Sequence, residues 1–404
     1  MTARSRRAAA ASPVTRHRYF GWKLVVAGLG LLGVAGCVLG PDPAGFDEEV
    51  ESFTAQGGYR PERTLATTTL REVWQHDRTE LDIVYTVPDE AGRFPLVLYF
   101  PGLGEDAAAG ASWRLAWAAA GYAVLSAQPA SLVHAIGSAE PLNAGDLRAL
   151  ARRQFASSAL RRRVEHAVWA VAELQRRART ELPYARADAA HLAVAGFDLG
   201  AQTAAALSGE VGDEAVAAAM TPQAAILLSP YVSLASGQPG AGFASVRLPL
   251  VAVTATEDDD PYGLAFASLR QAAWNALPGG EQFGLVLQGG SHLLLSGADA
   301  DQYLQRRSRA RETAMGAGEP PGMSGGQGAM LVPSSGFGGG GPGMGTDFGL
   351  PRRNPKADAR QVAAVRSVTT AFLDATLRNS SEARRWLENS ARSWLGQLAT
   401  LKRK

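Results

Sequence analysis

Cysteine is almost absent from this chain, which has one, Cys37, among its 404 residues. An intrachain disulfide is therefore impossible, and the fold must be stabilised by its core. Charge is also scarce, since only 19% of the residues are Asp, Glu, Lys or Arg and the formal net charge is +2. The basic residues are scattered rather than gathered in a stripe, and we find no nucleic-acid-binding motif. We therefore expect no nucleic-acid partner.

An apolar run long enough to cross a membrane is missing as well. Residues 24–36 are apolar, but the run is short and rich in glycine for a spanning helix. The residues before it include several arginines and no acid. A basic segment followed by a short apolar segment that ends in small residues is typical of a secretory signal peptide.

Cys37 directly follows this apolar run, and residues 34–37 resemble a bacterial lipobox, in which the cysteine is lipidated and becomes the first mature residue. We therefore expect a signal peptide over 1–36 and a tether over 37–65, a segment rich in glycine, proline and acids. The alternative is an ordinary amino-terminal membrane anchor. Both alternatives predict an exported protein that is held at a membrane of the cell envelope, facing the periplasm or the exterior.

What the chain has in abundance is apolar sequence, with 46% hydrophobic residues and eight tryptophans. This composition indicates a globular protein with a sizeable core. Short apolar segments alternate with helical ones and predict a mostly parallel eight-stranded α/β sheet covered by helices on both faces, over residues 66–401. The expected strands are 67–74, 81–87, 96–100, 122–126, 192–195, 225–228, 250–254 and 283–287.

Residues 314–356 interrupt this pattern with a segment rich in Gly, Pro and Met. It offers few apolar side chains, so we expect a disordered insert within the domain. After it, 357–377 and 381–401 are expected to form two amphipathic helices, followed by a basic tail.

Three candidate catalytic sites follow predicted strands, in the order nucleophile, acid, histidine that is typical of α/β-hydrolases. The first is Gly-Phe-Asp-Leu-Gly at 196–200, a nucleophile elbow with Asp198 in place of serine. The second is the run of aspartates at 258–260, and the third is His292 in a glycine-rich turn. Open α/β sheets bind ligands at the carboxyl ends of their strands, which is where all three are expected.

Each candidate also has a plain structural explanation. An aspartate after a strand is often a helix N-cap, an acidic run is usually a solvated turn, and a lone histidine is more often structural than catalytic. The order and the strand context together favour a catalytic site. The other five histidines lack such a setting and show no metal-ligand spacing, so we expect neither a metal nor a cofactor.

Residues from about 95 to 297 resemble the dienelactone-hydrolase-like or platelet-activating-factor-acetylhydrolase-like bacterial branch of the α/β-hydrolases. The elbow matches that branch except at Phe197 and Asp198. The acid loop at 254–263 resembles that of the branch, and the histidine loop at 289–297 resembles it closely. The resemblance makes Asp258 the partner of His292, and it makes the backbone N–H groups of Leu103 and Leu199 the oxyanion hole. The segment 231–247 is too short to hold a large cap domain.

Aspartate at the elbow changes the chemistry, because a carboxylate is already an anion at neutral pH. It can attack a substrate carbon while histidine activates water for a second step. Alternatively, Asp198 or His292 acts as a general base on water, or the site has lost catalysis and binds a ligand or partner. We expect a hydrolase of a small ester, lactone or alkyl substrate with an Asp198–His292–Asp258 triad.

Overall fold

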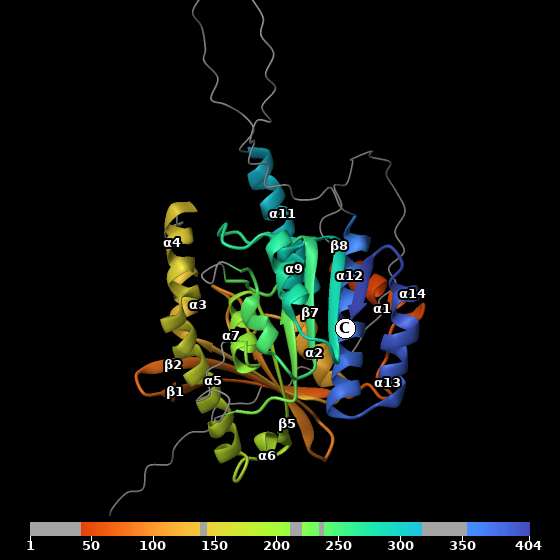
Figure 1. The fold of residues 1–404 in the computed structure, drawn as a ribbon. Coiled ribbons are helices and arrows are strands. Elements are labelled where there is room, and N and C mark those ends of the chain that lie inside the picture. Colours follow the sequence, from red (N-terminus) through yellow and green to blue (C-terminus); the bar gives the residue numbers. More distant parts are fainter. Residues whose placement is uncertain (1–41, 138–143, 211–219, 234–237, 317–353) are drawn as a thin grey trace, which may run out of the picture. The chain divides into compact units, whose positions relative to one another are not determined.

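The apolar segments of the chain form the strands of one nine-stranded sheet, in the order β1-β2-β4-β3-β5-β6-β7-β8-β9 (Figure 1). A computed structural model describes residues 42–137, 144–210, 220–233, 238–316 and 354–404. Strands β3 to β8 run parallel to one another, whereas β1, β2 and β9 pair antiparallel. The strands are β1 (Thr67–His76), β2 (Thr79–Pro88), β3 (Phe94–Phe100), β4 (Ala123–Pro129), β5 (Ala187–Phe197), β6 (Ala224–Leu228), β7 (Leu250–Glu257), β8 (Gln282–Ser291) and β9 (Ala399–Arg403). The α/β architecture and its mostly parallel sheet are confirmed, with one strand more than the eight expected.

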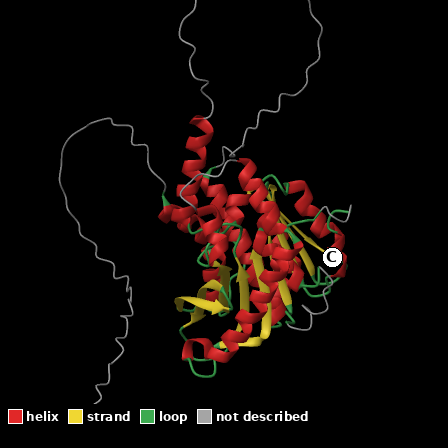
Figure 2. Ribbon diagram, turned by 90° about the vertical axis from the view of Figure 1, so that its left-hand side faces the viewer, coloured by secondary structure: helices red, strands yellow, loops and turns green. Residues whose placement is uncertain are grey.

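Side chains on the two faces of the sheet belong to two separate hydrophobic cores. On β5, Ala193, Ala195 and Phe197 face one core, while Leu192 and Val194 face the other. Alternate residues of a strand point to opposite faces, so a strand buried on both faces must be apolar throughout. Helices cover both faces, as the red and yellow layers of Figure 2 show. The first core contains α2 (Ala111–Ala119) and α12 (Pro355–Leu377), and the second contains α5 (Ser157–Arg177), α7 (Leu199–Leu207) and α9 (Ala267–Ala276).

The carboxy-terminal segment differs from the single helix expected over 381–401. It forms α13 (Ser381–Arg385), the π-helical turn η2 (Trp386–Ser390) and α14 (Ala391–Leu395), and then strand β9 beside β8. Gly396 has a φ of 53°, which ends the helix, because glycine adopts this left-handed region without strain. Beyond it, buried Ala399 and Leu401 alternate with exposed Thr400, a period of two that suits an edge strand.

The segment expected to be a tether contains a packed helix, α1 (Pro43–Ala55). Asp42 caps it by accepting a 3.0 Å hydrogen bond from the Gly45 N–H. Phe46 and Val50 are buried in the first core, and the Phe53 ring stacks 4.7 Å from that of Trp394 in α14. Helix α1 is therefore part of the folded body and not of a tether.

Several sequence predictions lie outside the described residues. They are the signal peptide, Cys37 and most of the 314–356 insert, whose flanks are the end of α11 (Ala300–Gly316) and the start of α12. None of the helices that the structure describes is long and apolar enough to cross a membrane. Between β6 and β7, the described residues hold only the short 3₁₀ helix η1 (Ala241–Ser245) and no large cap. The architecture is compatible with an α/β-hydrolase-like fold.

Candidate active site

Asp198 occupies a sharp turn between β5 and α7. Its φ of 51° and ψ of −110° are rare for a residue with a side chain, and such strain costs on the order of 1–3 kcal/mol. The turn is possible only with glycine on either side. A Cβ at Gly196 would lie 2.3 Å from the Gly200 carbonyl carbon, and one at Gly200 would lie 1.9 Å from the Phe100 carbonyl oxygen. The sequence Gly-Phe-Asp-Leu-Gly therefore forms a strained elbow that presents the side chain of its central residue.

We expect Gly200→Ala to destabilise the fold, because the added methyl group must push apart the backbones of α7 and β3. The loss should be about 1–3 kcal/mol of unfolding free energy or more, and chemical denaturation measures it. Gly279→Ala is the matched control, since no atom lies within 4 Å of a Cβ there. Equal midpoints for the two variants would show that the elbow does not need glycine at position 200.

Asp258 and His292 approach the elbow from the carboxyl ends of β7 and β8. His292 begins α10 (His292–Leu295) after β8, and its Nδ1 lies 2.7 Å from Asp258 Oδ1. Its Nε2 lies 3.8 Å from Asp198 Oδ1. The three residues proposed from the sequence thus lie together, with the histidine between two carboxylates.

The other two aspartates of the acid loop serve the backbone. Exposed Asp259 accepts a 2.8 Å hydrogen bond from the Ala267 N–H, near the start of α9. Asp260 is buried and accepts the N–H groups of Tyr262, at 2.8 Å, and Leu264, at 3.1 Å. Of the three, Asp258 alone bonds to the histidine.

Asp258 is fully buried, yet its charged form is favoured. Burial by itself raises the pKa of this carboxyl, but the Arg270 charge and the His292 hydrogen bond outweigh it, so that the pKa is lowered overall. Ser229 and Thr254 also donate hydroxyl hydrogen bonds of 2.8 Å each to its two oxygens. A charged Asp258 fixes the orientation of the His292 ring and leaves Nε2 facing Asp198.

The two oxygens of the Asp198 carboxylate have different surroundings. Oδ2 accepts a long hydrogen bond of 3.4 Å from the Leu103 N–H and lies 3.3 Å from the Tyr262 hydroxyl. Oδ1 faces His292 Nε2 and lies 4.0 Å from Arg270 Nη2. Leu199, the other expected oxyanion donor, is the first residue of α7. The donor expected to bind a substrate oxygen, Leu103 N–H, therefore binds an oxygen of Asp198 itself.

Tyr262 keeps its proton at this site, because burial and the nearby Asp198 charge raise the pKa of its hydroxyl well above the usual value. The hydroxyl lies 3.3 Å from the Leu103 carbonyl oxygen as well as from Asp198. Tyr262 also belongs to a small apolar cluster with Leu103, Leu199, Phe155 and Leu132. Asp198, beside this cluster, is only 1% exposed.

A second acid lies in the loop after β3. The Glu105 side chain is 11% exposed, and its Oε2 accepts a 2.9 Å hydrogen bond from the Gly102 N–H. Burial raises the pKa of Glu105 to about 7, and the Asp198 charge acts in the same direction, although the Gly102 bond opposes both. Glu105 therefore changes its charge near neutral pH within range of the triad.

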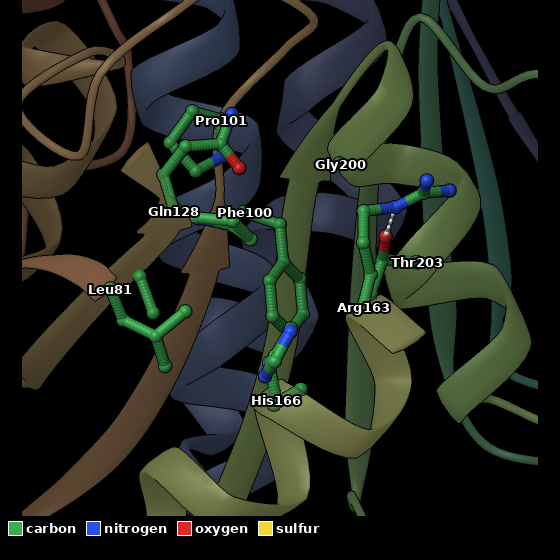
Figure 3. Close-up of a pocket in the computed structure, with 11 residues that line it drawn as sticks. Leu81, Phe100, Pro101, Gln128, Arg163, His166, Gly200 and Thr203 are labelled. Atoms are coloured by element: carbon green, nitrogen blue, oxygen red, sulfur yellow. Dashed lines mark hydrogen bonds between the residues drawn. The ribbon is translucent and has the colours of Figure 1, made fainter. Parts of the chain in front are cut away.

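A small pocket is lined by Gly200 of the elbow together with residues of β3, β4 and α5 (Figure 3). The buried Arg163 of α5 lines it and donates to Thr203 Oγ1 at 2.9 Å and to Gln202 Oε1 at 2.6 Å, both on α7. Burial lowers the pKa of Arg163 to about 9. These bonds tie α5 to α7, the helix that follows Asp198.

Sequence reasoning missed Tyr262 and Arg270. Tyr262 stands two residues after the aspartate run, which could have indicated that it lies near the site. Arg270 lies in the helix after that run, and no sequence pattern marks it as a site residue. Among the described residues, no group of three His, Cys, Asp or Glu side chains could hold a metal ion. In comparisons with protein-family models and with curated proteins, the chain matched none.

Proposed function

We propose that this protein is a hydrolase in which Asp198 attacks an alkyl carbon of a small substrate and His292 activates the water that completes the reaction. The observation that carries the proposal is that the two oxygens of the Asp198 carboxylate have different partners. Donors hold Oδ2, while Oδ1 faces the histidine. A carboxylate held in this way keeps one oxygen for bond formation.

In the first step, Oδ1 forms a bond to the alkyl carbon as the bond to the leaving group breaks, and the leaving group departs with the electron pair. In the second step, His292 takes a proton from water, and the resulting hydroxide attacks Cγ of the Asp198 ester. Negative charge then develops on Oδ2, where Leu103 N–H and the Tyr262 hydroxyl stabilise it. Collapse releases the alcohol, which receives the proton from His292, and leaves Asp198 as a carboxylic acid. Loss of its proton to solvent restores the carboxylate.

Attack at a carbonyl carbon is less well supported. It would give a mixed anhydride, and the oxyanion of the substrate would need the donor that Asp198 Oδ2 occupies. Esters and lactones are therefore expected to react at their alkyl carbon, with a carboxylate as leaving group. The proposal includes export and lipid anchoring through Cys37, which rest on the sequence alone.

A single turnover in heavy-oxygen water tests the proposal. The alcohol leaves with the original Oδ1, so the water oxygen must remain in the Asp198 carboxylate, where mass spectrometry of the peptide detects it. Product formation with an unlabelled Asp198 would contradict the covalent mechanism and favour direct attack by water.

One observation favours a second candidate, a binding protein without activity. Asp198 is 1% exposed and its carboxylate already has partners, as in a purely structural ion cluster. A broad panel of esters and alkyl halides separates the two. Equal background rates for wild type, Asp198→Asn and His292→Ala would support the binding protein.

A further inference from the structure

Arg270 of α9 is a fully buried cation at the centre of the site. Its Nε donates to the Asp258 carbonyl at 2.8 Å, and its Nη1 donates to the Ser229 carbonyl at 2.6 Å. The guanidinium also lies 3.4 Å from Asp258 Oδ1, 4.0 Å from Asp198 Oδ1 and 3.9 Å from Asp260 Oδ2. One positive charge therefore faces three carboxylates that come from two different loops.

This arrangement bears on the residue at the elbow. A serine there adds no charge, whereas an aspartate adds a negative charge to a buried site that already contains Asp258 and Asp260. Leaving such a charge uncompensated is strongly destabilising. The Arg270 guanidinium is the cation that contacts both the elbow and the acid loop, and it carries a fixed charge.

The same cation acts on the histidine. Arg270 Nη2 lies 3.4 Å from His292 Nδ1, while Asp258 and Asp198 face the two ring nitrogens and Glu105 acts from the loop after β3. One cation thus contacts the acid, the histidine and the elbow residue.

We propose that Arg270 is the positioning residue that allows a carboxylate to serve as nucleophile here: it offsets the charge of Asp198 and holds the acid loop beside His292. This inference rests on the function proposed above and explains how the site tolerates aspartate where serine is usual.

The pH profiles of kcat/KM for two variants separate the effect of the Arg270 charge from the effect of its hydrogen bonds. Arg270→Met removes the charge and Arg270→Lys keeps it, while both lose the forked hydrogen bonds. We expect the acidic limb of Arg270→Met to move to higher pH by about one unit, with a loss of turnover of about 100-fold. In Arg270→Lys we expect the acidic limb to stay at its wild-type pH, and the loss of turnover to be smaller than in Arg270→Met. Because Glu105 titrates in the same range, the profiles are repeated with Glu105→Gln. An unmoved limb and equal losses in the two variants would overturn the inference.

A second measurement does not depend on activity. Arg270→Met is combined with Asp198→Asn, and the unfolding equilibrium of the four proteins is compared by chemical denaturation. We expect loss of Arg270 to be at least tenfold less harmful when Asp198 is already neutral, about 1.4 kcal/mol of coupling. Asp259→Asn is the control. Asp259 is exposed, and the amide oxygen of asparagine can still accept the hydrogen bond from the Ala267 N–H, so we expect no coupling with Arg270→Met.

If the single variant Arg270→Met does not fold, recovery of folded protein when it is combined with Asp198→Asn shows the same coupling. Failure of that recovery, or an absence of coupling, would overturn the role of Arg270. Labelling of Asp198 in heavy-oxygen water tests the proposed function separately, so the two failures are distinguishable.

Discussion

Asp198→Asn should reduce turnover of every substrate to the uncatalysed background, a loss of about 10⁴-fold or more. The amide has the size of the carboxylate but is not a nucleophile, so the first bond cannot form. The elbow should survive, because its geometry depends on Gly196 and Gly200 and on the backbone hydrogen bond from Asp198 N–H to Leu228. Single-turnover kinetics combined with thermal unfolding measures both effects.

Asp198→Ser and Asp259→Asn serve as comparisons for this result. Serine frees the Leu103 N–H from the carboxylate oxygen, so a gain of esterase activity would show that the donor can bind a substrate oxygen. Asp259→Asn should keep the wild-type rate, since Asp259 only caps the backbone before α9. If Asp198→Asn retained turnover within tenfold of wild type, the nucleophilic role would be wrong and His292 would be acting on water directly.

His292→Gln should separate the two steps of the reaction. The attack by Asp198 does not require a base, whereas hydrolysis of the resulting ester does. We therefore expect the alkyl ester of Asp198 to accumulate in stoichiometric amount while steady-state turnover disappears. Intact-protein mass spectrometry would detect the added alkyl group, and peptide mapping would place it.

The control for this variant is His191→Gln, since His191 is half-exposed and lies in the amino-terminal half of β5, away from Asp198. Wild type and His191→Gln should show no lasting adduct. An absence of adduct in His292→Gln, with the first step also lost, would mean that the histidine acts before the alkyl bond forms. That outcome would favour base catalysis on water.

The central sheet could be predicted from the sequence because its strands are buried on both faces. Apolar runs such as 96–100 and 192–195 are too short for a helix and lie between turn residues, so they predict buried strands. Strand β9 and helix α1 were not predictable in the same way. Residues 399–403 are half-exposed and basic, and 43–55 is a weakly amphipathic helix in an acidic segment. Their stability comes from partners that lie far away in the chain.

The residues of the site also differ in whether the sequence predicts them. Asp198, Asp258 and His292 could be proposed because each directly follows a strand, where the chain itself dictates the position. Arg270 and Tyr262 reach the site from a helix and a loop, so only the packing brings them to the carboxylate. A charged residue on a helix is usually solvated, and sequence alone gave no reason to expect a buried one.

The pairing of α1 with the carboxy-terminal helices has a consequence for how the chain acquires its fold. The Tyr59 hydroxyl donates to Asp374, 315 residues away, and Trp394 donates to the Phe53 carbonyl across 341 residues. Chains are synthesised at about 5–20 residues per second, so the earlier partner waits for tens of seconds or more before the later one exists. Strand β8, which directly precedes His292, gains its last neighbour in the same late stage. The apolar face of α1 therefore lacks its partners in α12 and α14 until residues 355–395 have been synthesised.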